Sequence, residues 1–440
     1  MNNKNFVNFH VLFSHSPSCL NRDDMNMQKT AVFGGVTRVR ISSQSLKRAL
    51  RTSDYYILNL GKSSTRTRNL EKAKGLLVES LKNEFSKELI EEAANRFVKA
   101  SVAVEEEDGE GTENSGDLED GVSSNTKKLA VAPWVTEEIR VLCRIIDEVK
   151  KEGLSNDEKE KALKKLGKSF GKGKDKKTLT ENDCLDIALE TKIAKRIEDK
   201  ISELRFAIGK ALDVALSGRM ATSGLMLSVD GALAVAHAIT THAVEPQDVD
   251  WFTAVDDLTQ DAGESGAGHL NTQQFSSGVF YRYASLNLKQ LQVNLGLISD
   301  MKSEETDESR QKVLDVAKHI FHLFTTVVPS AKQQSFAAHN LADFALVSFS
   351  DQPISLANAF EKPVEAARNS GYLRPSVHTL IAYWHKIKKA YGIDEWAAAF
   401  FLDDTVVESA SKDGSWPPIL RPFSEASKMK TWIAGNGKES

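Results

Sequence analysis

Strand-like segments lie near both ends of this 440-residue chain, and a long, charge-rich helical stretch separates them. Residues 6–13 are dense in Phe and Val and are bounded by turn-forming residues, which is typical of a strand. After Ser217 the pattern changes again, and probable strands alternate with helices. This order favours one α+β core that carries insertions over a row of independent domains.

Apolar residues recur at helical spacing through the middle stretch. Residues 69–100 have a helical pattern, residues 134–149 predict another helix, and a further apolar stripe runs from Ile201 to Leu216. Beyond it, we expect strands at 224–229, 231–241, 279–284 and 344–349, helices at 311–328 and 376–391, and a short apolar segment at 396–402.

Two charge runs interrupt the helical stretch. Residues 105–120 hold nine acids, three glycines and no base, and residues 164–177 hold seven lysines, three glycines and one aspartate. Neither run can bury enough apolar surface to offset the loss of chain entropy on folding. We therefore expect residues 101–128 and 164–177 to be disordered or solvated, with no firm role assigned to either.

The remaining composition excludes several classes of protein. No run of about 18 apolar residues could span a bilayer, and the N-terminus lacks the apolar core of a secretory signal, so a cytoplasmic protein is expected. The three cysteines, Cys19, Cys143 and Cys184, form no CxxC pair, which argues against disulfides and a cysteine zinc site. Nucleotide-binding loops of the GxGxxG or GxxxxGK[ST] type are missing, and we expect no cofactor.

The stretch from Met25 to Ser53 carries six basic residues and no acid, although the chain has a net charge of −4. Residues 37–41 alternate apolar and basic side chains and predict a strand, and Ser42 or Ser43 can cap a helix that follows. Arginine side chains and the free N–H groups at a helix N-terminus both bind phosphate groups. A phosphate-binding surface and an ordinary solvated helix are equally compatible with this pattern. Its basic members are Lys29, Arg38, Arg40, Lys47, Arg48 and Arg51.

Catalytic patterns are weaker. The doublets at 23–24, 256–257 and 403–404 could hold Mg²⁺ only with partners from elsewhere in the fold. His319 and His322 lie three residues apart on a predicted helix, with no third metal ligand nearby in the sequence. Trp251 and Phe252 lie in a polar, glycine-bearing segment, where aromatic rings could either stack on bases or form a small local core.

Several long sequence strings closely resemble the CasC family, the CRISPR-RNA-binding backbone subunit of the type I-E Cascade complex and a member of the RAMP superfamily. They occur in the same order between the N-terminus and about residue 361. They are SHSPSCLNRDDMNMQKTAVFGG, RVRISSQSLKRALR, ALSGRMATSG, DGALAVAHAITTH, DWFTAVDDL, FSSGVFYRYA and PISLANAFE. The resemblance implies an α+β fold shaped like a right hand. A palm resembling an RNA-recognition motif (ferredoxin-like) would span 1–60 and 217–440, helical fingers 61–216, and a thumb hairpin about 247–275.

The same resemblance implies a function. Copies of the subunit stack into a helical filament along the guide RNA with other Cascade subunits, and each thumb displaces a base and meets the incoming target DNA. Met220 would lie beside the displaced base, and Trp251, Phe252 and Thr253 would belong to the thumb. The guide backbone would be held by Arg22, Lys29, Ser42, Gln44, Lys47, Arg48 and Arg51. Arg38 and Arg40 could bind RNA or equally serve the structure of the palm.

The expected function is thus a non-enzymatic, antiviral RNA-binding scaffold without a membrane partner, in which base pairing supplies the sequence specificity. The chain departs from the family pattern at Val36 and Thr37, where basic residues would add phosphate contacts. The resemblance therefore does not define the number of phosphate contacts. The main alternative is a metal-dependent endoribonuclease, because backbone subunits of the related type III effectors cleave RNA with a loop aspartate; Asp23 or Asp24 would take that role. A pure assembly module is a third possibility.

Overall fold

The computed structural model describes residues 3–67, 69–102, 132–164, 166–167, 169–170, 177–220, 228–254, 267–368, 371–405 and 416–438. The chain divides into two compact units. Unit 1 comprises 1–62, 232–293 and 297–440, and unit 2 comprises 63–231 and 294–296. The expected boundaries were 60/61 and 216/217. The acidic run at 105–120 lies outside the described residues, as do residues 165, 168 and 171–176 of the lysine-rich run.

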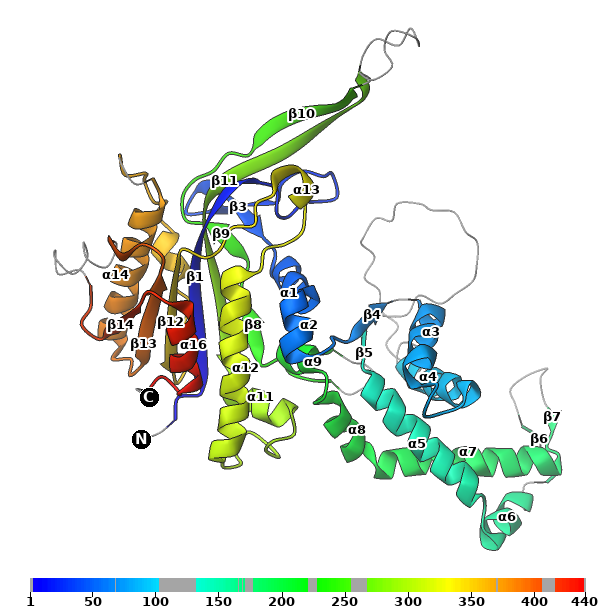
Figure 1. The fold of residues 1–440 in the computed structure, drawn as a ribbon. Coiled ribbons are helices and arrows are strands. Elements are labelled where there is room, and N and C mark those ends of the chain that lie inside the picture. The colour runs from blue at the N-terminus through cyan, green and yellow to red at the C-terminus, as the bar shows by residue number, and fades with distance from the viewer. Residues whose placement is uncertain are drawn as a thin grey trace. The chain divides into compact units, whose positions relative to one another are not determined.

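Unit 1 is built on one large mixed sheet (Figure 1). Its main path runs in the order β14-β13-β12-β1-β11-β9-β3-β2, and β8 and β10 pair with β11 outside that path. The strands are β1 (Phe6–Ser18), β2 (Thr30–Phe33), β3 (Val36–Ile41), β8 (Leu233–Val235), β9 (Ala238–Thr240), β10 (Gln247–Ala254), β11 (Ala267–Asn287), β12 (Phe344–Ser350), β13 (Trp396–Phe401) and β14 (Leu420–Phe423).

Helices cover both faces of this sheet. On β1, Phe9 packs against Phe324 of α12 at 6.3 Å between ring centroids, whereas Leu12 joins the core beneath α14. The side chains alternate because successive residues of a strand point to opposite faces. Both faces of β1 are therefore buried. The helices of unit 1 are α1 (Ser43–Thr52), α2 (Asp54–Leu60), α11 (Leu288–Asn294), α12 (Asp307–Thr326), α13 (Gln333–Phe336), α14 (Leu373–Tyr391) and α16 (Ala426–Ala434), with a 3₁₀ turn at Ala357–Phe360.

The longest strand, β11, pairs with two partners in succession. Residues 276–287 pair with β1, and residues 267–275 pair with β10 to form an antiparallel hairpin (Figure 1). Gly278 lies shortly after the change of partner, where it pairs with His15 beside an irregularity in the register with β1. A Cβ at this position would lie 2.5 Å from Nε2 of His242, and the backbone has φ +154°, so a larger residue would displace the histidine.

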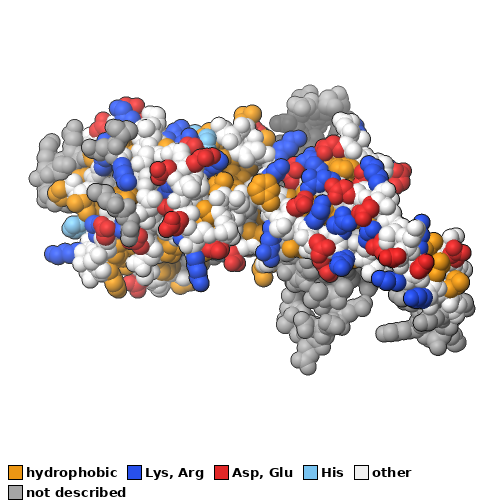
Figure 2. All heavy atoms as spheres, turned by 90° about the horizontal axis from the view of Figure 1, so that it is seen from below, with side chains coloured by type: hydrophobic (Ala, Val, Ile, Leu, Met, Phe, Trp, Pro, Cys, Tyr) orange, Lys and Arg blue, Asp and Glu red, His pale blue; other side chains and the backbone are white. Residues whose placement is uncertain are grey.

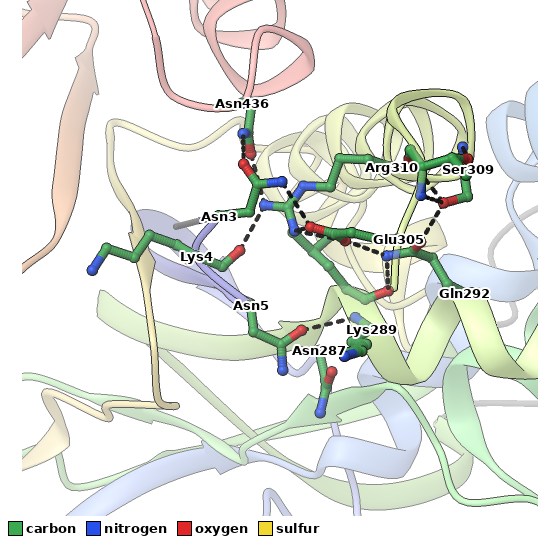
Figure 3. Close-up of polar contacts among 12 residues, drawn as sticks. Asn3, Lys4, Asn5, Asn287, Lys289, Gln292, Glu305, Ser309, Arg310 and Asn436 are labelled. Carbon is green, nitrogen blue, oxygen red and sulfur yellow. Dashed lines mark hydrogen bonds and ion pairs between the residues drawn. The ribbon is translucent and has the colours of Figure 1, made fainter. Parts of the chain in front are cut away.

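A polar network ties both ends of the chain to the start of α12 (Figure 3). The guanidinium of Arg310 donates to the carbonyl of Lys4 at 2.6 Å and to Oδ1 of Asn436 at 2.7 Å, and it lies 3.4 Å from the carboxylate of Glu305. Asn3 donates to the same carboxylate at 2.7 Å. These contacts fix the C-terminal helix α16 to the body of unit 1.

Unit 2 is mainly helical, with a core of apolar residues from α3, α4, α5, α7 and α8. The predicted stripe from Ile201 to Leu216 is two helices, because the first ends at Gly209. The helices are α3 (Leu70–Leu81), α4 (Lys87–Val102), α5 (Thr136–Glu152), α6 (Asn156–Leu163), α7 (Glu181–Asp199), α8 (Ile201–Ile208) and α9 (Leu212–Ser217); the short strands are β4 (Thr65–Thr67), β5 (Ala132–Trp134), β6 (Ser169–Phe170) and β7 (Lys177–Thr178).

Opposite charges alternate on the surface of unit 2 (Figure 2). Lys192 contacts Glu152 and Glu158 at 3.1 Å, and Lys200 contacts Glu148 at 2.9 Å. The charges of these helices therefore compensate one another instead of forming a surface of one sign.

Most of the expected elements are confirmed, including the strands within β1, β3, β11 and β12 and the helices α12 and α14. The segment 396–402 is the strand β13. The sequence pattern missed several elements, among them β2, β10, β14, α7 and α16, although the family resemblance implied the hairpin that contains β10. Residues 221–227, which include most of one predicted strand, lie outside the described part. No described helix combines the length and apolar character that a membrane span requires.

Candidate nucleic-acid interface

Helix α1 presents the predicted basic surface. Ser42 caps it as expected, since its hydroxyl accepts a hydrogen bond from the backbone N–H of Ser45 at 3.2 Å. Leu46 and Leu50 are buried against the sheet, so the polar residues of the helix are turned away from the core. Gln44 and Arg48 are exposed, and Lys47 and Arg51 are partly exposed. No acid lies in the helix.

The loop before β2 lies beside the start of this helix. Oδ1 of Asn21 accepts a hydrogen bond from the backbone N–H of Ser42 at 2.8 Å, which joins the loop to the helix cap. Arg22 donates to Oδ1 of Asn26 at 2.7 Å, within the same loop. Lys29 is partly buried where the loop enters the sheet, and its carbonyl accepts from the N–H of Arg40. Loop and helix cap are therefore one connected structure.

Three cations from distant parts of the sequence line one hollow of about 560 Å³. Arg22 comes from the loop, Arg48 from α1, and Lys332 from the segment before α13. Burial raises the pKa of the neighbouring Cys19 thiol, and the positive charges of Arg22 and Lys332 oppose that rise. One acid, Asp23, also lines the hollow. The other lining residues are Leu20, Asn21, Asn26, Ser45, Ala49, Thr52, Pro329, Ser330 and Ala331.

Backbone conformation at the hollow is unusual at two residues. Asn26 has φ +63° and Lys332 has φ +54°, in the left-handed region that costs free energy for residues other than glycine. Such conformations occur frequently at functional sites. No local pattern predicts a role for Lys332, because this residue reaches the hollow only through the tertiary fold.

Arg38 and Arg40 are placed differently from the cations of α1. The side chain of Arg38 is fully buried, and its guanidinium donates to the carbonyls of Phe360 at 2.8 Å and Thr240 at 3.2 Å. Burial lowers the pKa of Arg38. Arg40 is partly exposed and donates to the carbonyl of Thr30 at 3.0 Å. In this chain Arg38 thus holds together strands and loops of unit 1.

Met220 of unit 2, whose side chain is 95% exposed, follows a close-packed bridge between Arg219 and Val229. The preceding residue, Arg219, forms a buried ion pair with Glu138, with N···O distances of 2.6 and 2.8 Å. Arg219 also exchanges two backbone hydrogen bonds with Val229, each of 2.9 Å. A Cβ on Gly218 would lie 2.8 Å from the carbonyl oxygen of Val229. The exposed side chain of Met220 is therefore attached to a part of unit 2 that is held by a buried ion pair and by backbone hydrogen bonds.

Trp251, Phe252 and Thr253 lie on β10 of the hairpin. The backbone of Trp251 is opposite Asn271 and that of Phe252 is opposite Leu270, and the register shifts between Phe252 and Ala254. Their side chains lie outside the described part of the structure.

The alternative catalytic residues lie in ordinary surroundings. Oδ1 of Asp23 accepts hydrogen bonds from the N–H groups of Met25 and Met27, both at 2.9 Å, and Asp24 is exposed. His319 accepts or donates a hydrogen bond to Tyr55 at 2.9 Å, and the ring of His322 lies 3.8 Å from that of Tyr55. Among the described residues, no group of three or more His, Cys, Asp or Glu side chains is arranged to hold a metal ion.

Comparisons with known proteins place the chain in a family. A chain from a CRISPR RNA-guided surveillance complex, pre-nicking, is similar at 25% identity and a TM-score of 0.65, covering 98% of this chain and 100% of that one. A second, from a CRISPR RNA-guided surveillance complex, is 18% identical with a TM-score of 0.52 and the same coverage, and shows the fold alone. No curated protein sequence matches. A family model for CT1975-like proteins matches residues 7–416, and the chain therefore belongs to the CT1975-like protein family.

Proposed function

We propose that this protein is a backbone subunit of a Cascade-like CRISPR RNA-guided complex and that it binds the guide RNA without cleaving nucleic acid. The family assignment and the likeness to a chain of a surveillance complex support a Cascade-like role. The finer proposal is the type I-E CasC subunit, with an RNA-recognition-motif-like palm in unit 1 and helical fingers in unit 2. Copies would stack in a filament along the guide and present its bases to target DNA in the cytoplasm.

The observation that carries the proposal is the hollow shared by Arg22, Arg48 and Lys332 beside the cap of α1. Guanidinium groups bind phosphate oxygens through paired, charge-assisted hydrogen bonds. Hydroxyl groups of Ser45 and Thr52 line the same hollow and can bind sugar or phosphate oxygens. Since these groups recognise the backbone of a nucleic acid, the protein would hold guides of any sequence.

A scaffold role is proposed over a nuclease role because the carboxylate of Asp23 is already used within the loop, where it accepts two backbone hydrogen bonds. A nuclease would need further acidic ligands to bind Mg²⁺. In the proposed complex, Trp251, Phe252 and Thr253 of the hairpin and Met220 of unit 2 would contact the nucleic acid near displaced bases.

Two experiments test the proposal. The complex purified from its host should contain a discrete RNA, seen as a high ratio of absorbance at nucleic-acid to protein wavelengths and as one band on a denaturing gel. A complex free of RNA would exclude the guide-binding role and favour an assembly module. The purified complex should also leave a complementary RNA intact in Mg²⁺. Cleavage at regular spacing that is lost in Asp24→Ala would overturn the scaffold proposal.

A further inference from the structure

A second hollow lies in the C-terminal segment of unit 1, between β14 and α16. It is formed by residues 421–438, all beyond residue 416, where the family match ends. The segment is firmly attached. Trp432 of α16 packs against Phe349 of the sheet at 5.4 Å between ring centroids, and Asn436 binds Arg310 (Figure 3). The hollow is therefore part of the folded body of unit 1.

The hollow has a volume of about 250 Å³, and three kinds of side-chain group line it. There are three cations, two hydroxyls and two aromatic rings, and none of the described lining residues is acidic. Glu425 lies nearby and contacts Lys428 at 2.7 Å. The segment 420–438 contains four basic residues and one acid, in a chain of net charge −4. The cations are Arg421, Lys428 and Lys438, the hydroxyls Ser427 and Thr431, and the rings Phe423 and Trp432.

Two of these cations lie beside aromatic rings. Cζ of Arg421 lies 5.1 Å from the centroid of the Phe423 ring, and Nζ of Lys438 lies 5.8 Å from that of Trp396. Both distances are within the range of a cation–π contact. Cations and hydroxyls bind phosphate and sugar oxygens, and planar side chains stack on bases whatever their identity. An acidic peptide would use the cations but would leave the aromatic and planar groups without a matching partner.

We propose that this hollow binds one nucleotide of a single-stranded nucleic acid, with phosphate at Lys428 and Lys438 and the base stacked on Arg421 and Phe423. The site is distinct from the guide-binding surface on α1. Single-stranded RNA and DNA share the phosphate and base that it would recognise, so the test contains an arm for each.

The test is photocrosslinking of the full-length chain to two six-nucleotide probes, oligo(U) with a photoreactive uridine and oligo(dT) with a photoreactive thymidine. Mass spectrometry then locates the crosslinked peptides. We expect crosslinks within 420–438, with the more reactive probe identifying RNA or DNA as the ligand. The Lys428→Ala/Lys438→Ala variant should weaken these crosslinks and flatten the slope of log affinity against log salt by about 0.7, for one lost phosphate contact on a single strand.

Two variants separate this site from the proposed function. Lys47→Ala/Arg48→Ala should retain the crosslinks in 420–438, and Phe423→Leu should weaken them while leaving thermal stability close to that of the unmodified chain. Crosslinks confined to α1 would overturn this inference and leave guide binding standing. Crosslinks confined to 420–438 would support this inference and count against guide binding at α1. In a competition experiment, an oligoglutamate of equal charge should displace the probes less readily than an unlabelled oligonucleotide does. Equal displacement would identify a surface for acidic peptides and overturn the nucleotide site.

Discussion

Arg219 and Glu138 form a two-bond ion pair inside unit 2, with neither side chain exposed to solvent. The pair joins α5 to the backbone segment just before Met220. Burial raises the pKa of Glu138, and the charge of Arg219 opposes that rise. Because water does not reach either charge, removing one side chain would leave the other as a buried charge without compensation.

We therefore expect Arg219→Met to destabilise unit 2 by about 3–5 kcal/mol, and Glu138→Leu/Arg219→Met to recover much of that loss. The measurement is the midpoint of urea unfolding. Arg144→Met is the matched control, because the Arg144–Glu203 pair is largely exposed and should change stability by less than about 1 kcal/mol. Equal losses in the single and double variants would contradict this account.

A second prediction concerns acid stability. His10 lies in β1, and burial lowers its pKa to about 3. Because the unfolded chain takes up a proton near pH 6.5 and the folded chain does not, stability is lost as pH falls from about 6.5 to 3, at up to about 1.4 kcal/mol per pH unit. His10→Gln should reduce this slope in thermal unfolding followed at several pH values. His385→Gln, at an exposed position of α14, should leave it unchanged.

The third prediction tests α1. Lys47→Ala/Arg48→Ala should weaken guide RNA binding whatever the RNA sequence, and should flatten the slope of log affinity against log salt by about 1.4, for two phosphate contacts on a single strand. Lys386→Ala/Lys389→Ala, at exposed positions of α14 in the same unit, removes equal charge elsewhere. If both double variants gave the slope of the unmodified protein, α1 would not contact the phosphates.

Arg38 should behave in the opposite way. Arg38→Gln removes donors from buried carbonyls, each of which costs about 1–3 kcal/mol when left unpaired, so the melting temperature should fall. The salt dependence of RNA binding by the folded protein should stay the same. A flatter slope without loss of stability would instead make Arg38 a phosphate contact.

Lys332 offers a test that separates charge from strain. Lys332→Gly removes the cation from the hollow and relieves the left-handed backbone, so we expect a slope flatter by about 0.7 with no loss of thermal stability. Ala337→Gly is the control, since Ala337 also has positive φ (+48°) and carries no charge. A salt response that is identical in the two variants would remove Lys332 from the interface.

Local sequence patterns predicted the parts of the fold that depend on local chemistry. A helix cap at Ser42 or Ser43 could be predicted, and Ser42 takes that role, because the signal for a cap lies within a few neighbouring residues. The apolar run of β1 likewise predicted a strand. The mixed α+β class followed from the order of these signals along the chain.

Features formed by long-range packing could not be predicted in this way. Lys332 reaches the hollow of Arg22 from about 300 positions away in the sequence, and nothing in its neighbours marks it. Arg38 and Arg48 have the same chemistry in the sequence, yet one is fully buried and the other exposed. The periodicity of the sequence did not predict strand β10, because its polar residues resemble those of a loop; only the family resemblance implied a hairpin there. Pairing with β11 compensates for the weak pattern.

The continuity of β11 has a mechanical consequence. A strand of 21 residues extends for roughly 70 Å at about 3.3 Å per residue, and the same backbone forms the hairpin with β10 and the middle of the sheet. The hairpin is therefore anchored in the sheet through β11, which pairs with β1 on one side and with β8 and β9 on the other. Bending of the hairpin would therefore act on the strand between Phe275 and Ser276, where the pairing changes from β10 to β1.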